Sequence, residues 1–284
     1  MKSIRIISFL LTISILGGLF SISASAKKSN IKTYKQYKYI EVNDKKEIRI
    51  VGFETDRKKL DESGLTISFP KKIKGKKVTE LNISKVFNSI FKNHYAIANS
   101  QVVPLSIKIN SRIKNIIYTR RMTTQIYWYD VDANNKYYSS KKGVLYNKSK
   151  TKLINYNALY PRKTFSIPKT VKNIGSLAFV NSENLKKVNL NIGLKTIEYY
   201  ALSGVDRINK IPKTVTTIKT GAFCNCWSLK KIKVPSSVKI LEKCNFGYTT
   251  LPYPKYNKQF IIKGKKGSAA WKYAKKHKLK FKAV

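Results

Sequence analysis

Acidic residues are scarce in this chain of 284 residues. It contains 14 Asp and Glu against 58 Lys and Arg, which gives a formal net charge of +44 at pH 7. Hydrophobic residues make up 42% of the chain and aromatic residues 12%, so we expect a folded core and exclude wholesale disorder. A charge imbalance of this size favours a polyanionic partner.

Histidine is also rare, with 2 copies. His94 and His277 lie in unrelated contexts, and we expect His277, in a lysine-rich stretch, to be solvated. The acids form no clear acid–base couple, and the chain has no glycine-rich phosphate loop, zinc-binding histidine motif or nucleophile elbow. We therefore expect a protein that is not an enzyme and needs no cofactor.

Asp130 and Asp132, in the segment YWYDVDANN, are the acids that come closest to forming a pair. Their spacing is compatible with a two-carboxylate calcium loop. The simpler interpretation is that they begin the turn before an inserted hairpin. We expect no metal site.

Residues 1–26 are predicted to form a secretory signal peptide. Lys2 and Arg5 precede the uncharged run Ile6–Ile22, and the small residues Ala24–Ala26 follow it. The alternative is an uncleaved membrane anchor, but the run is at the lower limit for crossing a bilayer. Without the signal the chain keeps 56 basic and 14 acidic side chains, a net charge of +42. We expect a protein that is secreted, extracellular or associated with the cell surface, without a covalent anchor, since no sorting motif is found at its end.

The second half of the chain contains an internal repeat. Copies begin at Ile167, Leu190, Ile211 and Val234, which are 23, 21 and 23 residues apart. A period in the low twenties predicts a solenoid, in which stacked copies place like residues above one another. The apolar columns are Val171, Leu194, Val215 and Val238; Ile174, Ile197, Ile218 and Leu241; Phe179, Leu202, Phe223 and Phe246; and Leu185, Ile208 and Leu229.

The pattern of these copies, IPxxVxxIxxxAFxxCxxLxxIxI, resembles the BspA-like leucine-rich repeats of bacteria. Phe69–Phe87 resembles a divergent first repeat, and the apolar residues of Ile109–Ile116 match those that follow Ile167. Asn135–Tyr156 resembles the β-hairpin insertion, and Gly264–Phe281 the terminal cap, of this family.

The resemblance implies a mainly β fold with short helical turns. The core would be a leucine-rich-repeat solenoid of ~23-residue repeats with an inserted β-hairpin, an N-terminal β cover and a C-terminal helix–strand cap. It also implies surface adhesion or protein–protein interaction. The expected domains are the signal peptide 1–26, the N-terminal cover and divergent first repeat 27–103, the repeats 104–250 with the hairpin at about 132–160, and the cap 251–284.

The two ends of the solenoid are expected to be covered. The alternation in Tyr34–Phe53 indicates strands, and Ser268 is a suitable N-cap for a helix over Ala269–Lys276. Ala270, Trp271 and Ala274 would form the packing face of that helix. A basic membrane-binding helix is the alternative. The segment from Phe87 to Val131 fits the repeat poorly.

The 3 cysteines are Cys224, Cys226 and Cys244. In an exported protein an odd number leaves at least one thiol free. Resemblance to the family places Cys226 in a buried column, and a Cys224–Cys244 disulfide between adjacent coils is the other interpretation. Cys-Asn-Cys alone supplies too few ligands for a metal.

Aligning the copies predicts which lysines lie together on the outer faces of the solenoid. One predicted column on the outer face of the sheet contains Lys187, Lys210 and Lys231. A second column occupies the positions directly after the column that begins with Val171. It contains Lys172, Lys195 and Lys239, and Thr216 interrupts it. The predicted binding residues are Lys186, Lys187, Lys210, Lys230, Lys231 and Lys233.

The charge is spread evenly, since Lys27–Phe165 and Ser166–Val284 each carry a net charge of +21. We expect an extended partner: an anionic cell-wall polymer, a glycosaminoglycan or an acidic protein surface. A small-molecule substrate and sequence-specific nucleic acid are not expected, and the chain would associate peripherally with the envelope. The alternatives are that lysine only solubilises the surface, that the chain binds extracellular nucleic acid non-specifically, or that it recognises proteins through aromatic anchors. Those anchors would be Tyr127, Trp128, Tyr129, Tyr199 and Tyr200.

Overall fold

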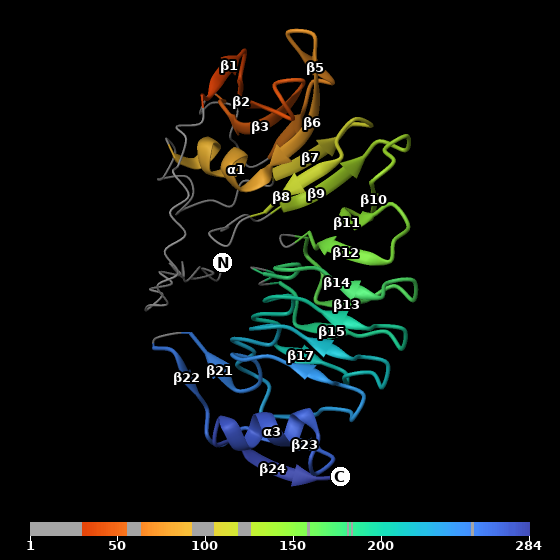
Figure 1. The fold of residues 1–284 in the computed structure, drawn as a ribbon, viewed down its shortest axis with the longest axis vertical. Helices are drawn as coiled ribbons and strands as arrows, with labels where there is room; N and C mark the ends of the chain where they lie inside the picture. Colours follow the sequence, from red (N-terminus) through yellow and green to blue (C-terminus); the bar gives the residue numbers. More distant parts are fainter. Residues whose placement is uncertain are drawn as a thin grey trace, which may run out of the picture.

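The computed structural model describes residues 30–55, 64–92, 105–118, 126–157, 160–180, 182, 184–250 and 253–284. Over these residues the chain forms an elongated stack of short strands, with the first strands at one end and the C-terminus at the other (Figure 1). The predicted signal peptide and His94 lie outside the described residues. Among the described residues, no helix has the length and apolar character needed to cross a bilayer.

A mixed sheet forms the first end of the stack, where strands were predicted between Tyr34 and Phe53. Its first three strands are antiparallel, and the third pairs in parallel with β6, which also pairs with β5 and β8. The strands are β1 (Lys32–Tyr34), β2 (Tyr37–Val42), β3 (Glu47–Phe53), β5 (Lys72–Ile73), β6 (Lys76–Asn82) and β8 (Asn115–Ile117).

Helix α1 (Ile83–Lys92) directly follows β6 and was not predicted. Its apolar residues Ile83, Val86 and Ile90 recur at helical spacing and are at most 1% exposed. Ser89 fixes the helix to β3, because its hydroxyl accepts from the backbone N–H of Phe53 at 2.7 Å.

A second, parallel sheet lies beside the first and contains β4 (Leu65–Ser68), β7 (Leu105–Ile109) and β9 (Ile126–Val131). Ile107 lies in register with Ile67 on one side and with Tyr129 on the other. All three side chains are 0% exposed, so they form one row of the core.

The predicted β-hairpin is present as β10 (Tyr138–Lys141) and β11 (Val144–Asn147). Both residues of its turn have positive φ, 51° at Lys142 and 76° at Gly143, as two-residue hairpin turns require. β11 continues antiparallel into β12 (Lys152–Asn155), which then pairs in parallel with β14. The hairpin is therefore continuous with one wall of the repeat stack.

Two walls of very short parallel strands form the repeat region. One wall continues from β12 through β14 (Asn173–Ile174), β16 (Thr196–Ile197), β18 (Thr217–Ile218) and β20 (Ile240–Leu241). The other wall consists of two three-stranded sheets. The first contains β13 (Thr164–Ser166), β15 (Lys187–Asn189) and β17 (Arg207–Ile208), and the second contains β19 (Lys231–Lys233), β23 (Ile261–Gly264) and β24 (Lys280–Ala283). A small antiparallel pair, β21 (Tyr248–Thr249) and β22 (Lys255–Tyr256), extends from the last coil.

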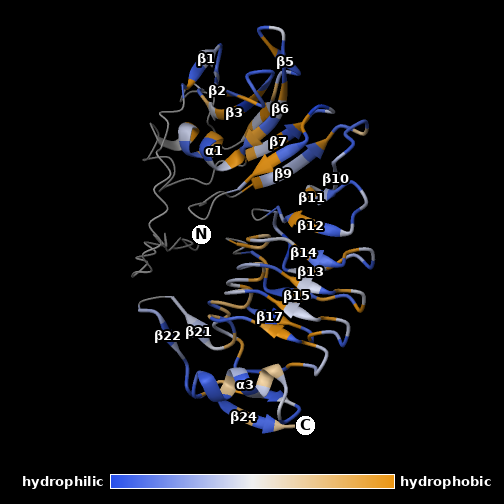
Figure 2. Ribbon diagram, viewed as in Figure 1, coloured by the Kyte–Doolittle hydropathy of each residue, from blue (hydrophilic) through white to orange (hydrophobic). Residues whose placement is uncertain are grey.

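Three of the four predicted core columns are confirmed. The valine, isoleucine and phenylalanine columns are at most 1% exposed, except that Leu241 is half-buried. In the fourth, Leu185 is buried, and Ile208 and Leu229 are half-buried against the same core. Ile208 pairs with Val188, however, so the prediction that it shares a column with Leu185 is wrong. The buried apolar residues of the coils form one core cluster along the stack, and apolar stretches recur in successive coils (Figure 2).

A repeated asparagine contact connects the first coils to the later ones. The side-chain amides of Asn135 and Asn191 each donate to two carbonyls of the preceding coil, at 2.8 to 2.9 Å. The acceptors occupy equivalent repeat positions, which supports the match predicted for Ile109–Ile116. They are Asn110 and Ile113 for Asn135, and Pro168 and Val171 for Asn191.

Helix α3 (Ala269–Lys276) and β24 form the last layer of the stack. Ser268 caps the helix as predicted, accepting from the backbone N–H of Trp271. Ala270 and Ala274 are buried, but the prediction that Trp271 packs inward is wrong, because Tyr273 occupies that face. Positions 270, 273 and 274 share one side of a helix, whereas position 271 points about 100° away from it.

Candidate binding surface

The wall that contains β13, β15 and β17 displays its charged residues on its outer face. Phe165 and Val188 are buried and lie in register, so the residues on either side of them point outward. The outward position before them is occupied by Thr164 in β13, Lys187 in β15 and Arg207 in β17.

The predicted column of Lys187, Lys210 and Lys231 is therefore wrong at Lys210. Arg207 pairs with Lys187, and Lys210 is exposed two residues beyond the end of β17. The copy that begins at Leu190 reaches its strand three residues sooner than the copy that begins at Ile167, which brings Ile208 level with Val188 rather than with Leu185.

Lysines are denser on the outer face of the last three strands of this wall. Lys233 of β19 pairs with Lys263 of β23, which pairs in turn with Lys282 of β24. One step earlier along the strands, Lys231 pairs with Ile261, and Ile261 with Lys280. We call this set of five lysines the C-terminal lysine face: Lys231, Lys233, Lys263, Lys280 and Lys282.

Like charges at this spacing repel. Two unit charges about 4.8 Å apart in water repel by roughly 0.9 kcal/mol before salt screening. Among the described residues, none of these lysines forms an ion pair with a carboxylate. The ammonium groups splay into solvent, but they remain a concentrated positive field.

The other predicted lysine column is confirmed by backbone hydrogen bonds. The N–H of Lys195 donates to the carbonyl of Lys172 at 2.7 Å, and that of Thr216 donates to the carbonyl of Lys195 at 2.9 Å. The N–H of Lys239 then donates to the carbonyl of Thr216 at 2.9 Å. All three lysine side chains are exposed, so this wall also carries a charged row along the stack.

The few carboxylates described in the repeat region are engaged between coils. Glu198 contacts Lys152 at 2.6 Å and accepts from the backbone and hydroxyl of Ser176. Glu242 accepts from the hydroxyl and backbone N–H of Thr220 and pairs with Lys219 at 3.3 Å. The Thr220 hydroxyl is the main reason that the pKa of Glu242 is lowered.

Two predicted binding lysines have partners within the chain. Lys186 lies 3.7 Å from a carboxylate oxygen of Asp206, and Lys230 donates to the carbonyl of Trp227 at 3.0 Å. Lys187, Lys231 and Lys233 are exposed on strands. The sequence did not lead us to Lys263, Lys280 and Lys282, although the alternation in FIIKG and LKFKA was a usable signal.

The predicted aromatic anchors do not form one surface. Tyr129 is 0% exposed, and burial raises its pKa. Tyr127 and Trp128 are half-buried and pack with Tyr160, with ring centroids 5.8 to 6.4 Å apart.

The other two anchors, Tyr199 and Tyr200, lie in the turn that follows β16. Their ring centroids are 4.5 Å apart. The ring of Tyr200 packs against Gly221 of the next coil, and burial raises its pKa. These two tyrosines therefore belong at least in part to the packing between coils.

The prediction that His277 is solvated is wrong. Its ring stacks on Tyr256 with centroids 4.3 Å apart and lies 4.5 Å from the ring of Tyr273. Burial, then the nearby charges of Lys276 and Lys258, lower its pKa.

All three cysteines are free thiols. Cys224 is fully buried, whereas Cys226 is partly exposed and its sulfur lies 3.4 Å from the carbonyl of Leu202. Burial raises the pKa of Cys226 to about 12 and also raises those of Cys224 and Cys244. The prediction that Cys226 is buried is therefore confirmed only in part, since Cys226 packs against the core but keeps some exposure.

Asp132 begins a turn, as predicted. Its side chain accepts from the N–H of Asn134 at 2.9 Å, and its carbonyl accepts from the N–H of Asn135. Asp130 is exposed at the end of β9. No group of three or more metal-binding side chains occurs in the part of the chain that the structure describes.

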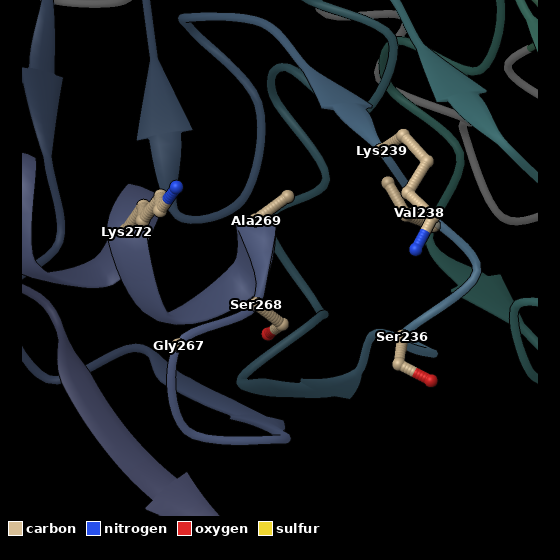
Figure 3. Close-up of a pocket in the computed structure, with 7 residues that line it drawn as sticks. All are labelled: Ser236, Val238, Lys239, Gly267, Ser268, Ala269 and Lys272. Carbon is tan, nitrogen blue, oxygen red and sulfur yellow. The ribbon is translucent and has the colours of Figure 1, made fainter.

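A small open cavity of about 240 Å³ lies between the last coil and the start of α3 (Figure 3). Lys239 reaches it from the end of the second lysine column, and Lys272 borders it from the helix. Ser236 and Ser268 add hydroxyl groups. The cavity is open to solvent and bordered by two lysines, so it extends the basic surface rather than forming an enclosed site.

Comparison with known proteins identifies the repeat. Residues 152–264 match the BspA type leucine rich repeat region in 6 copies. The protein carries a BspA-type leucine-rich-repeat region. The resemblance drawn from the sequence is thereby confirmed for these residues, and the part of the chain that the structure describes is mainly β with two short helices. No curated protein matches the chain.

Solved structures with a similar arrangement share little sequence with it. The pneumococcal vaccine antigen PcpA is 14% identical over 90% of this chain and 99% of that one, with a TM-score of 0.40. A leucine-rich repeat protein from Eubacterium ventriosum is 19% identical over 86% of this chain and 79% of that one, with a TM-score of 0.45. A leucine rich cell surface protein from Faecalibacterium prausnitzii is 14% identical over 75% of this chain and 91% of that one, with a TM-score of 0.38.

Proposed function

We propose that this leucine-rich-repeat protein is exported, has no enzymatic activity, and binds anionic polymers at the bacterial cell surface. The observation that supports this most directly is the register of Lys233, Lys263 and Lys282 on adjacent strands, with no carboxylate paired to them among the described residues. A surface that only needs solubility interleaves both signs of charge.

The two walls together suit an extended ligand. The C-terminal lysine face lies on one wall, and the row of Lys172, Lys195 and Lys239 runs along the other. A polymer that carries many charges gains from each contact as it releases counterions. A single small ligand would touch only a fraction of these groups.

Retention at the surface would follow from the same charge. The predicted signal peptide supports export, and a polyanionic envelope would hold the mature chain without a covalent bond. In this proposal the repeat stack is a rigid scaffold, and the lysines on it supply the affinity.

The test is cosedimentation of the purified mature chain with bacterial cell walls at 50 mM and 200 mM salt. We expect binding to fall by on the order of 500-fold over this range, because about five phosphate contacts give a slope of about −4.5 for log affinity against log salt concentration. The matched control is the same wall preparation after its phosphate polymer has been extracted. Binding that is unchanged by salt, or by the extraction, contradicts the proposal.

Protein recognition is the second candidate, and the cluster of Tyr127, Trp128 and Tyr160 favours it. Partly exposed aromatic rings are common anchors in protein interfaces. A Tyr127→Ala variant and a Lys187→Glu/Lys231→Glu variant separate the two candidates. Loss of cell-wall binding only in the tyrosine variant would favour protein recognition.

A further inference from the structure

The C-terminal lysine face is a concentrated basic surface built on three paired strands. Ile232, Ile262 and Phe281 lie in register on the inner side of β19, β23 and β24, where Ile262 is 0% exposed. The side chains one position before and after them therefore project outward. Five of those six outward positions are lysine, and the sixth is Ile261.

The rows of this face run across the strands, along the axis of the stack. Strands in a sheet lie about 4.8 Å apart, so three paired lysines span roughly 10 Å, and the two rows lie about 7 Å apart along the strand. The chain reaches this arrangement by parallel pairing in direct register, which places the Cα atoms of Lys233, Lys263 and Lys282 beside one another. The result is a short double row of point charges.

The chemistry of the face selects among polyanions. Its outward positions contain no aromatic ring, no arginine and no amide. Binding of single-stranded nucleic acid relies on aromatic rings that stack on the bases, and this face offers none. Lysine binds phosphate as a compact point charge, without the fixed fork geometry of arginine. The face therefore suits a flexible chain of phosphate groups joined by small neutral units.

We propose that the C-terminal lysine face is the main docking site for a linear phosphodiester polymer of the poly(glycerol phosphate) kind, which lies across β19, β23 and β24. This inference rests on the proposed function and specifies its site and its ligand. The row of Lys172, Lys195 and Lys239 on the other wall contributes only long-range attraction, because Thr216 separates its last two lysines.

Docking here has a structural consequence for the end of the stack. β24 is the last strand, and it is held by pairing with β23 and by a hydrogen bond from the N–H of Val284 to the carbonyl of Gly264. The lysine rows cross this junction, so their repulsion opposes its closure. A bound chain of phosphates would neutralise them and hold β24 against β23.

The experiment compares two variants with equal loss of charge. Lys233→Gln/Lys263→Gln/Lys282→Gln removes one row of the face, and Lys172→Gln/Lys195→Gln/Lys239→Gln removes the row on the other wall. Binding of each full chain to poly(glycerol phosphate), heparin and a single-stranded DNA of matched charge is measured between 50 mM and 200 mM salt. Thermal unfolding confirms that both variants are folded.

We expect the first variant to bind poly(glycerol phosphate) at least about 10-fold more weakly at 50 mM salt. Its slope of log affinity against log salt concentration should be smaller by about two to three. The second variant should lose less than about 3-fold in affinity. Hydrogen exchange of the wild type should slow at 261–264 and 280–284 when the polymer is added, and the first variant should lose this protection.

Equal losses in the two variants would overturn the docking site, and tighter binding of heparin or DNA would overturn the ligand class. Either result leaves the proposed function standing, provided that the wild type binds a polyanion in a salt-dependent way. Failure of the wild type to bind any of the three polymers would overturn the proposed function itself.

Discussion

The ring of Tyr200 lies directly against the backbone of Gly221 in the next coil. A Cβ added at Gly221 would lie 2.3 Å from Cε2 of Tyr200. The two residues occupy the same repeat position, which also includes Leu177 and Cys244, and all four have positive φ between 49° and 68°. Side chains evidently tolerate this conformation here, so it is the contact with Tyr200 that requires glycine at 221.

Gly221→Ala should therefore destabilise the protein by about 3 kcal/mol, from left-handed strain and a clash with a packed ring. Gly204→Ala is the matched control, because Gly204 has φ of 80° but no atom within 4 Å of an added Cβ. It should cost only about 1 kcal/mol. Urea unfolding of both variants measures the difference, and equal losses would show that backbone strain alone decides.

The phenylalanine column should tolerate leucine but not alanine. Phe223 is 1% exposed and stacks on Phe246 with centroids 4.9 Å apart, while the preceding coil has Leu202 at the same position. Phe223→Ala should cost about 4 kcal/mol because it opens a cavity. Phe223→Leu should cost about 1 kcal/mol, since the turn already accommodates leucine. Denaturant midpoints check both values, and a Phe223→Leu loss as large as that of Phe223→Ala would contradict the shared column.

The ring of His277 makes the last layer sensitive to pH. Its folded-state pKa is lowered, chiefly by burial, so below the unfolded pKa of about 6.5 the unfolded chain binds a proton that the folded chain resists. Stability from this group is complete above that pH and is lost as the pH falls through the window between the two pKa values. The melting temperature of the wild type should therefore drop more between about pH 7 and pH 5 than that of His277→Gln.

The carboxylates affect stability in a lower pH range than His277, so they provide an internal control for the His277 prediction. The pKa values of Glu47 and Glu242 are lowered, first of all by hydrogen bonds from Lys114 and Thr220. Their contribution is present above the unfolded pKa of about 4.5 and is lost below it, in both proteins alike. Parallel melting curves for the two proteins down to about pH 5 would show that His277 is not coupled to folding.

The repeat core could be predicted from the sequence because the same positions of each repeat are apolar and point into the core. Val171, Ile174 and Phe179 pointed to the buried positions of the coils that follow, and the structure places those positions in the core. The cap of α3 was equally readable, since Ser268 and two alanines at helical spacing are local signals. The domain boundaries stay predictions.

The sequence could not predict which charged residues lie side by side, because this depends on the strand register between coils of unequal length. The copy that begins at Leu190 reaches its strand three residues sooner than the copy before it, and this places Arg207 rather than Lys210 beside Lys187. Lys263 and Lys282 lie beyond the last recognisable repeat start, and only strand pairing shows that they continue the row of Lys233. Helix α1 was overlooked because its apolar residues lie in a segment assigned to a divergent repeat.

The thiols supply the last prediction. Cys224 is fully buried, and burial raises the pKa of all three cysteines, so little thiolate is present at neutral pH. Native protein should react with a thiol reagent at least about 10-fold more slowly than protein in denaturant. After unfolding, all 3 thiols should be labelled without prior reduction, because the structure holds no disulfide between Cys224 and Cys244. Mass spectrometry of the labelled chain counts them. A single label, with two more after reduction, would show instead that adjacent coils become cross-linked after export.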